Sequence, residues 1–166
     1  MRTLTLIRHG KSSWSDSSIS DWERPLEDRG KKDALLIGYK LKEDGILPDK
    51  IVSSSAKRAY DTAKRISECI EYPESEIAIT DDIYFATMDQ LIQIVKNLND
   101  DWGHVSIFGH NPYFTDFANK FGDKTIGNLP TTGVYQISFN CVSWQDISDS
   151  NGKTEKFFVP KDLKEQ

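Results

Sequence analysis

The sequence lacks several features that define whole classes of protein. Its two cysteines, Cys69 and Cys141, are too few for a disulfide framework, and neither lies in a CxxC metal-site spacing. No apolar run approaches the ~20 residues of a membrane span, and the apolar start reaches Arg8 too early for a signal peptide. Lysine and arginine number 21 against 26 acidic residues, whereas proteins that bind nucleic acid or anionic membranes are more often basic. We therefore expect a reduced, cytoplasmic protein with no nucleic-acid or membrane partner.

The composition is that of an ordinary packed globular protein. Hydrophobic residues make up 37% of the chain and charged residues 28%, which argues against intrinsic disorder. The length of 166 residues suits one domain, and no repeat, linker or low-complexity tract divides it. We therefore expect residues 1–166 to form a single domain. Histidine is scarce, with only His9, His104 and His110 present.

The order of apolar segments predicts an α/β fold. Short β-branched runs predict buried strands, and apolar residues spaced three or four apart predict amphipathic helices. Strands are expected at residues 3–7, 50–53, 76–80, 105–108, 134–139 and 155–159, with 141–147 a weaker candidate. Helices are expected at residues 25–43, 59–70, 88–98 and 114–121, with Gly45 ending the first and Ser54 or Ser55 capping the second. This alternation predicts a three-layer α/β/α sandwich with a mostly parallel central sheet and an antiparallel C-terminal edge.

Rare side chains fall where the predicted strands end. Arg8 and His9 close the first strand, Arg58 lies in the first turn of the helix after the second, and His110 follows the fourth. Because the carboxyl ends of parallel strands share one edge, where ligands bind, we expect these residues to meet in one cleft. Arg24, just before the first long helix, is expected at the same edge.

These residue types suit phosphoryl transfer. Arginine offers a planar fork of donors that matches phosphate oxygens in pairs. A neutral imidazole can attack phosphorus and form a covalent phosphoenzyme, and a second, protonated histidine can stabilise charge on the equatorial oxygens. Nearby positive charge favours the unprotonated form of the nucleophile. The sequence therefore predicts a phosphoryl-transfer cleft.

Each residue also has a simple structural explanation. Arg8 and His9 could be surface polarity, Arg58 a solvated helix position, and His110 a bystander in a helix cap. His104 precedes its strand on the opposite edge and is expected to be structural. Independent explanations of this kind would not place four such residues on one edge, and that coincidence favours function.

Three blocks of the sequence resemble the motifs of a known family. Residues 6–10, which include Arg8-His9-Gly10, resemble the RHG signature of the histidine phosphatase superfamily, which includes phosphoglycerate mutases and many phosphatases. Residues 53–63 resemble its second block and residues 109–112 its third. More narrowly, the chain is similar to SixA-type phosphohistidine phosphatases at residues 8–14, 24–26, 29–30, 130–133 and 160–163. The resemblance runs nearly end to end and implies a phosphoglycerate mutase-like fold.

The resemblance also implies a role for each site residue. His9 would be the phosphorylated nucleophile, Arg8 and Arg58 would hold the phosphoryl oxygens, and His110 would complete the pocket. Arg24 would add a further phosphate contact. No metal and no cofactor is implied.

The sequence leaves the proton donor for the leaving group open. Five acidic residues are equivalent candidates: Asp16, Asp21, Glu23, Asp81 and Asp82. An alkoxide leaving from a phosphate ester needs a positioned donor, whereas imidazole leaving from phosphohistidine needs one less. The lack of an obvious donor, together with a chain too short for a long lid, favours phosphohistidine on a protein as the substrate.

Three functions follow as hypotheses. The first is a phosphatase acting on a phosphorylated protein, and the second is a small-molecule phosphomonoesterase of the same superfamily. The third is a non-catalytic module that docks phosphorylated partners, for which His9 would be dispensable. A metal hydrolase is weaker, because flanking arginines would repel a cation. The sequence does not specify the oligomeric state.

Overall fold

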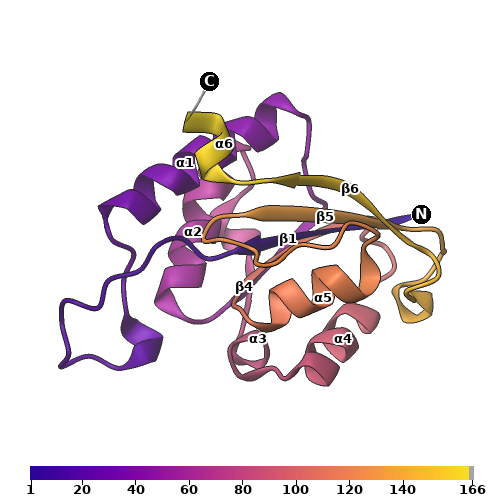
Figure 1. Cartoon of the computed structure of the whole chain (residues 1–166), viewed down its shortest axis with the longest axis horizontal. Helices are drawn as coiled ribbons and strands as arrows, with labels where there is room; N and C mark the ends of the chain where they lie inside the picture. The colour runs from indigo at the N-terminus through magenta and orange to yellow at the C-terminus, as the bar shows by residue number, and fades with distance from the viewer. Residues whose placement is uncertain (165–166) are drawn as a thin grey trace.

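A central sheet with helices on both faces forms the protein, whose computed structural model describes residues 1–164 (Figure 1). The strands are β1 (Arg2–Arg8), β2 (Lys50–Ser54), β3 (Ala78–Thr80), β4 (His104–Gly109), β5 (Val134–Phe139) and β6 (Gly152–Phe158). They pair in the order β3-β2-β4-β1-β5-β6. The strands β1 to β4 pair in parallel, whereas β5 runs antiparallel to β1 and β6. The predicted mostly parallel sheet with an antiparallel C-terminal edge is therefore confirmed.

Helices cover both faces of this sheet. On one face lie α1 (Asp28–Glu43) and α2 (Lys57–Cys69), and on the other α4 (Met88–Lys96) and α5 (Tyr113–Phe121). These match the predicted helices with small shifts at their ends. The shorter helices are α3 (Asp81–Phe85) and α6 (Pro160–Lys164), with 3₁₀ helices η1 (Asp21–Glu23), η2 (Glu74–Glu76) and η3 (Trp144–Asp146). No helix within residues 1–164 has the length and apolar character needed to cross a membrane.

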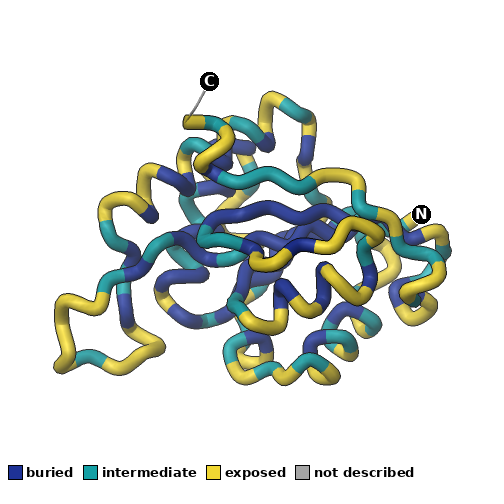
Figure 2. The backbone as a smooth tube through the Cα atoms, in the orientation of Figure 1, coloured by how far each residue is buried: buried dark blue, intermediate teal, exposed yellow. Residues whose placement is uncertain are grey.

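Apolar side chains form one cluster on each face of the sheet. Ile37 and Ile66, from α1 and α2, pack with Ile7 on one face. Phe117, from α5, packs with Leu6 on the other. The central strands are thus covered twice, and Figure 2 shows them as a continuous buried band. This double cover explains why successive residues of β1 and β4 are buried on both faces, including the polar Thr5 and Ser106.

One helix end follows from the local sequence, whereas another depends on tertiary contacts. Gly45, with a φ of 69°, follows the end of α1 as predicted, because glycine adopts this left-handed backbone at no steric cost. The prediction that Ser54 or Ser55 caps α2 is wrong, since the cap is Ala56 and it makes no side-chain capping bond. Ser54 ends β2, and its hydroxyl reaches a histidine ring. Ser55 donates to the Asp81 carboxylate. Contacts with other elements therefore engage both hydroxyls.

Several element boundaries differ from the predicted ones. The candidate strand at 141–147 does not form, because η3 turns the chain inward and buries Trp144, whose Nε1 donates to the Trp102 carbonyl at 2.8 Å. The strand β3 begins only at Ala78, after η2, and β6 begins at Gly152 rather than 155. The helix α3 was not predicted and follows β3 directly.

The carboxyl ends of β1, β2 and β4 lie together at one edge of the sheet. Arg8 is paired with Gly109 in the β1–β4 register, and the His9 amide donates to the Gly109 carbonyl at 3.0 Å. The chain between β1 and α1 extends from this edge as a long loop (Figure 1), with an isolated bridge between Ser12 and Leu26 at its base. This loop contains η1 and folds back, so that η1 lies near the edge where the strands end.

Candidate active site

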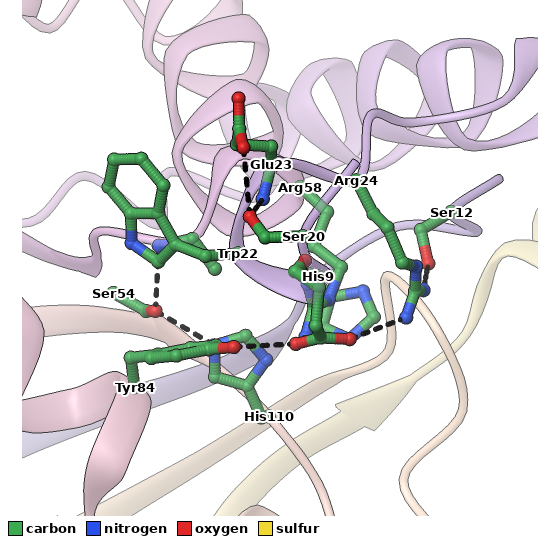
Figure 3. Close-up of polar contacts among 12 residues, drawn as sticks. His9, Ser12, Ser20, Trp22, Glu23, Arg24, Ser54, Arg58, Tyr84 and His110 are labelled. Atoms are coloured by element: carbon green, nitrogen blue, oxygen red, sulfur yellow. Dashed lines mark hydrogen bonds and ion pairs between the residues drawn. The ribbon is translucent and has the colours of Figure 1, made fainter. Parts of the chain in front are cut away.

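A cleft of about 500 Å³ opens at the carboxyl edge of the sheet. Its walls come from β1, η1, α2, α3 and the segment after β4, and they consist of Arg8, His9, Asp21, Arg58, Tyr84, Phe85, Ala86, His110, Asn111 and Tyr113. The structure thus places Arg8, His9, Arg58 and His110, which come from three separate stretches of the chain, around one space. Figure 3 shows His9, Arg58 and His110 gathered at one point.

His9 is buried and is held in one tautomer. Its Nδ1 lies 2.7 Å from the Gly10 carbonyl oxygen, which can only accept, so Nδ1 carries the proton and Nε2 keeps its lone pair. Burial lowers the pKa of His9 to about 3, with the charges of Arg58 and Arg8 acting in the same direction. At neutral pH the side chain is therefore an uncharged imidazole with a free nitrogen.

His110 faces His9 across the cleft. The two ring centroids are 5.2 Å apart, and Nε2 of His110 lies 2.8 Å from the Ser54 hydroxyl. Burial, with the charge of Arg58 next, lowers the pKa of His110 to about 4, and Asp21 opposes this shift. His110 is therefore neutral at pH 7 in the ligand-free structure. A phosphate dianion beside the arginines would raise this pKa and favour the protonated form expected from the sequence.

The two arginines of the cleft each retain an unpaired donor. Arg8 donates through Nη1 to the Leu129 carbonyl at 3.1 Å. Arg58 donates through Nη1 to the Asp21 carbonyl at 2.7 Å and through Nη2 to its carboxylate at 3.0 Å. Within residues 1–164, the buried Nε atoms of both arginines have no hydrogen-bond partner. Both arginines line the cleft, so their positive charges favour an anion there.

Asp21 connects the polar groups of the cleft. Its carboxylate accepts from Arg58 and Arg24, each at 3.0 Å, and from the Tyr84 hydroxyl at 2.7 Å (Figure 3). Burial alone would raise the pKa of Asp21, but the hydrogen bonds and the arginine charges outweigh burial and lower it. A carboxylate held in its ionised form is poorly suited to donate a proton. Sequence reasoning listed Asp21 only among five candidate donors and missed Tyr84 altogether.

Arg24 lies behind Asp21 and is not a lining residue of the cleft. Its Nε donates to the Ser13 carbonyl at 3.2 Å, and its Nη2 contacts the Ser12 hydroxyl. The Trp14 ring covers the guanidinium, with its centroid 3.3 Å from Cζ. The structure therefore ties Arg24 to Asp21 and the loop, whereas the resemblance implied a direct phosphate contact.

The other acidic candidates point elsewhere. Asp16 accepts from Ser18, Glu23 from the hydroxyl of Ser20, and Asp81 from Ser55. Asp82 lines a neighbouring groove instead, and none of these four carboxylates lines the cleft.

His104 lies at the opposite edge of the sheet, as expected. Its Nε2 is 2.8 Å from the Thr5 hydroxyl, and burial lowers its pKa. In the part of the chain that the structure describes, no group of three or more His, Cys, Asp or Glu side chains is arranged to hold a metal ion.

The segment before β5 fixes the end of β1 that leads into His9. Thr132 has a φ of 57°, and its amide donates to the carbonyls of both Arg8 and His9, at 3.0 and 3.1 Å. Such a left-handed backbone is unfavourable for a β-branched residue, so the surrounding contacts must hold it. These bonds explain why the block at residues 130–133 belongs with the site.

Comparison with known proteins agrees with this geometry. The family model described as histidine phosphatase superfamily (branch 1) matches residues 4–119. An uncharacterized chloroplastic protein of Arabidopsis thaliana is 29% identical over 159 residues, covering 91% of this chain and 72% of the relative. A 2,3-bisphosphoglycerate-dependent phosphoglycerate mutase of Bartonella henselae is 40% identical over 81 residues, which cover 48% of this chain and only 39% of the mutase.

Solved structures share the fold. The protein histidine phosphatase SixA in complex with tungstate superimposes with a TM-score of 0.81 at 19% identity, covering 97% of this chain and 99% of that one. The resemblance to SixA-type proteins and the phosphoglycerate mutase-like fold are therefore confirmed.

Proposed function

The chain belongs to the histidine phosphatase superfamily, and we propose that it removes phosphate from phosphohistidine on a protein, with His9 as the phosphorylated intermediate. The family match supports a phosphatase. The observation that carries the proposal is that the neutral, buried His9 lines the same cleft as Arg8 and Arg58. A nucleophile and an oxyanion site therefore share one cleft.

The proposed reaction has two displacements. In the first, Nε2 of His9 attacks phosphorus, the Nε2–P bond forms, the bond to the substrate nitrogen breaks, and the leaving imidazole takes a proton from solvent. In the second, water attacks phosphorus, the Nε2–P bond breaks with its electron pair returning to His9, and phosphate leaves while the water proton passes to solvent. Arg8, Arg58 and the protonated His110 stabilise the charge on the equatorial oxygens.

The polar groups of the cleft favour a nitrogen leaving group. Asp21 is the one carboxylate among the lining residues, and its lowered pKa keeps it ionised. Burial and the Asp21 carboxylate raise the pKa of Tyr84, so its phenol is a weak acid that already donates to Asp21. The protonated His110 is assigned to the equatorial oxygens, so no group is left over to protonate the leaving atom. An alkoxide then leaves slowly, whereas the less basic imidazole depends less on a donor.

A small phosphate ester is the second candidate substrate. The local similarity to a phosphoglycerate mutase favours it, although that match covers only 39% of the mutase. The cleft volume of about 500 Å³ is also within the range of small-molecule sites. The docking-module hypothesis is weaker, because a binding site needs no free imidazole nitrogen at its centre.

The test is capture of the phosphoenzyme. Wild-type protein, His9→Ala and the control His104→Gln are mixed with a phosphohistidine peptide labelled in its phosphate and quenched in alkali, which preserves phosphohistidine. We expect acid-labile label on the wild type and the control, and none on His9→Ala. In a parallel panel of alkyl phosphate esters, turnover is expected to be much slower.

Two results would contradict the proposal. Equal release of free phosphate by the wild type and His9→Ala would exclude His9 as the nucleophile. Faster turnover of alkyl esters than of any phosphohistidine peptide would assign the protein to the phosphomonoesterases.

A further inference from the structure

A second groove adjoins the catalytic cleft. Its volume is about 600 Å³, and its walls are the helices α3 and α4, which lie side by side in Figure 1. The lining residues are Asp82, Phe85, Asp89, Gln90, Gln93, Ile94 and Asn97. Phe85 lines both this groove and the cleft, so the two spaces adjoin at its exposed ring. A substrate that extends out of the cleft on this side meets the groove next.

The charged residues that line the groove are all acidic. Asp82 and Asp89 are exposed, and neither carboxylate has an ion-pair or hydrogen-bond partner among residues 1–164. No lysine or arginine belongs to the lining set. The catalytic cleft beside it instead contains two arginines. Two adjoining spaces of opposite charge suit a ligand with an anionic group and a cationic segment next to it.

The groove also has apolar surface. Phe85 has 72% of its surface exposed, although its ring packs edge-on against Tyr84 with centroids 4.8 Å apart. Ile94 is half-buried at the opposite wall. An exposed aromatic ring at the mouth of a cleft is typical of a contact surface. The amides of Gln90 and Gln93 add donors and acceptors that can pair with a peptide backbone.

We propose that this acidic groove binds the segment next to the phosphohistidine in the protein substrate. The segment would carry lysine or arginine opposite Asp82 and Asp89, and an apolar side chain against Phe85. Charge complementarity and adjacency to the cleft identify this occupant. The proposal rests on the function proposed above and specifies the kind of phosphoprotein that the protein accepts.

Two phosphohistidine peptides and a charge reversal test the proposal. The peptides are identical except that the flanks carry lysine and leucine in one and glutamate and serine in the other. The variants are Asp82→Lys with Asp89→Lys, and a matched control with Asp101→Lys and Asp149→Lys, two exposed acids outside the groove. Phosphoramidate, which has no flanks, reports on the cleft alone.

We expect the wild type and the control to prefer the basic peptide by roughly 10-fold in kcat/KM, as two surface charge pairs allow. The groove variant should lose or invert this preference while its turnover of phosphoramidate remains unchanged. The preference should also shrink as salt is added, because the pairs are exposed.

The outcomes separate the two proposals. If every protein cleaves both peptides equally well, the groove is not a docking site, although phosphohistidine hydrolysis would stand. If the wild type releases no phosphate from any phosphohistidine peptide, the proposed function fails and the groove proposal fails with it. If the wild type shows no preference between the peptides and forms a dimer, and the groove variant is a monomer, a second copy of the chain occupies the groove.

Discussion

Asp21 shows how one residue can organise a site without reacting in it. Its carboxylate and carbonyl together engage both Nη atoms of Arg58, and the carboxylate also holds Arg24 and Tyr84. These contacts fix the guanidinium of Arg58 at the wall of the cleft. The same negative charge repels a phosphate dianion, so Asp21 orients the arginine at some cost in anion affinity.

Replacement of Asp21 by asparagine separates these two effects. In Asp21→Asn the charge is lost while the shape is retained, so Arg58 is held less precisely and kcat should fall about 10- to 100-fold. Inorganic phosphate should inhibit more strongly, because repulsion from the carboxylate is gone. Steady-state kinetics with phosphoramidate, in the absence and presence of phosphate, measure kcat and the inhibition constant of phosphate. An unchanged kcat would show that Asp21 does not position Arg58 for the reaction.

At the scale of elements, the loop after β1 and the start of α1 are packed backbone against backbone. A Cβ atom added at Gly30 would lie 2.3 Å from the carbonyl oxygen of Lys11. The Glu27 amide donates to that same carbonyl at 2.9 Å. This close approach attaches the loop that carries η1, and hence Asp21, to the first helix of the fold.

Gly30→Ala should therefore destabilise the protein, although alanine is the better helix former by about 1 kcal/mol. The added methyl group would displace the Lys11 carbonyl, and we expect a net loss of roughly 1–3 kcal/mol in the free energy of unfolding. The control is Gly127→Ala, where a Cβ meets nothing within 4 Å and stability should be unchanged or slightly higher. Urea denaturation measures both. A stabilised Gly30→Ala variant would contradict the close approach.

At the scale of the whole molecule, the buried histidines make stability depend on pH. The pKa of His9 is lowered to about 3 and that of His110 to about 4, against the ordinary histidine pKa of 6.5. Below pH 6.5 the unfolded chain therefore binds protons at these positions that the folded protein does not, and acid favours unfolding. Their contribution to the loss begins near pH 6.5 and continues to about pH 3.

The double variant His9→Gln/His110→Gln tests this linkage. Without these two rings, less stability should be lost as the pH falls from 7 to 4.5, a window above the range in which most carboxylates titrate. Melting temperatures of the two proteins across that window are the measurement. Parallel curves for the variant and the wild type would mean that neither histidine is held neutral by the fold.

Much of the architecture could be predicted from the sequence because the signals are local. The short runs of apolar and β-branched residues in β1 and β4 predict buried strands, and the helical periodicity between the strands predicts the layers. Because the carboxyl ends of parallel strands share an edge, the sequence predicts that Arg8, His9 and His110 lie together. Gly45 predicted the end of α1 correctly for a similarly local reason.

Other features have no local signal and depend on tertiary structure. The segment 11–25 has no periodicity that specifies where Asp21 returns, and only the folded loop brings it to Arg58 and Tyr84. Trp144 lies in a stretch that resembles a strand, yet its burial against Trp102 turns the chain into η3.

The sequence by itself therefore determined the layers of the fold, the edge where the site lies and the residue types gathered there. These features follow from the periodicity of apolar residues and from the order of strands and helices along the chain. The tertiary structure alone decided which carboxylate orients the arginines, which candidates lie outside the cleft, and that an acidic groove adjoins it. Those features depend on distances between residues far apart in the chain, and such distances are set only when the core packs.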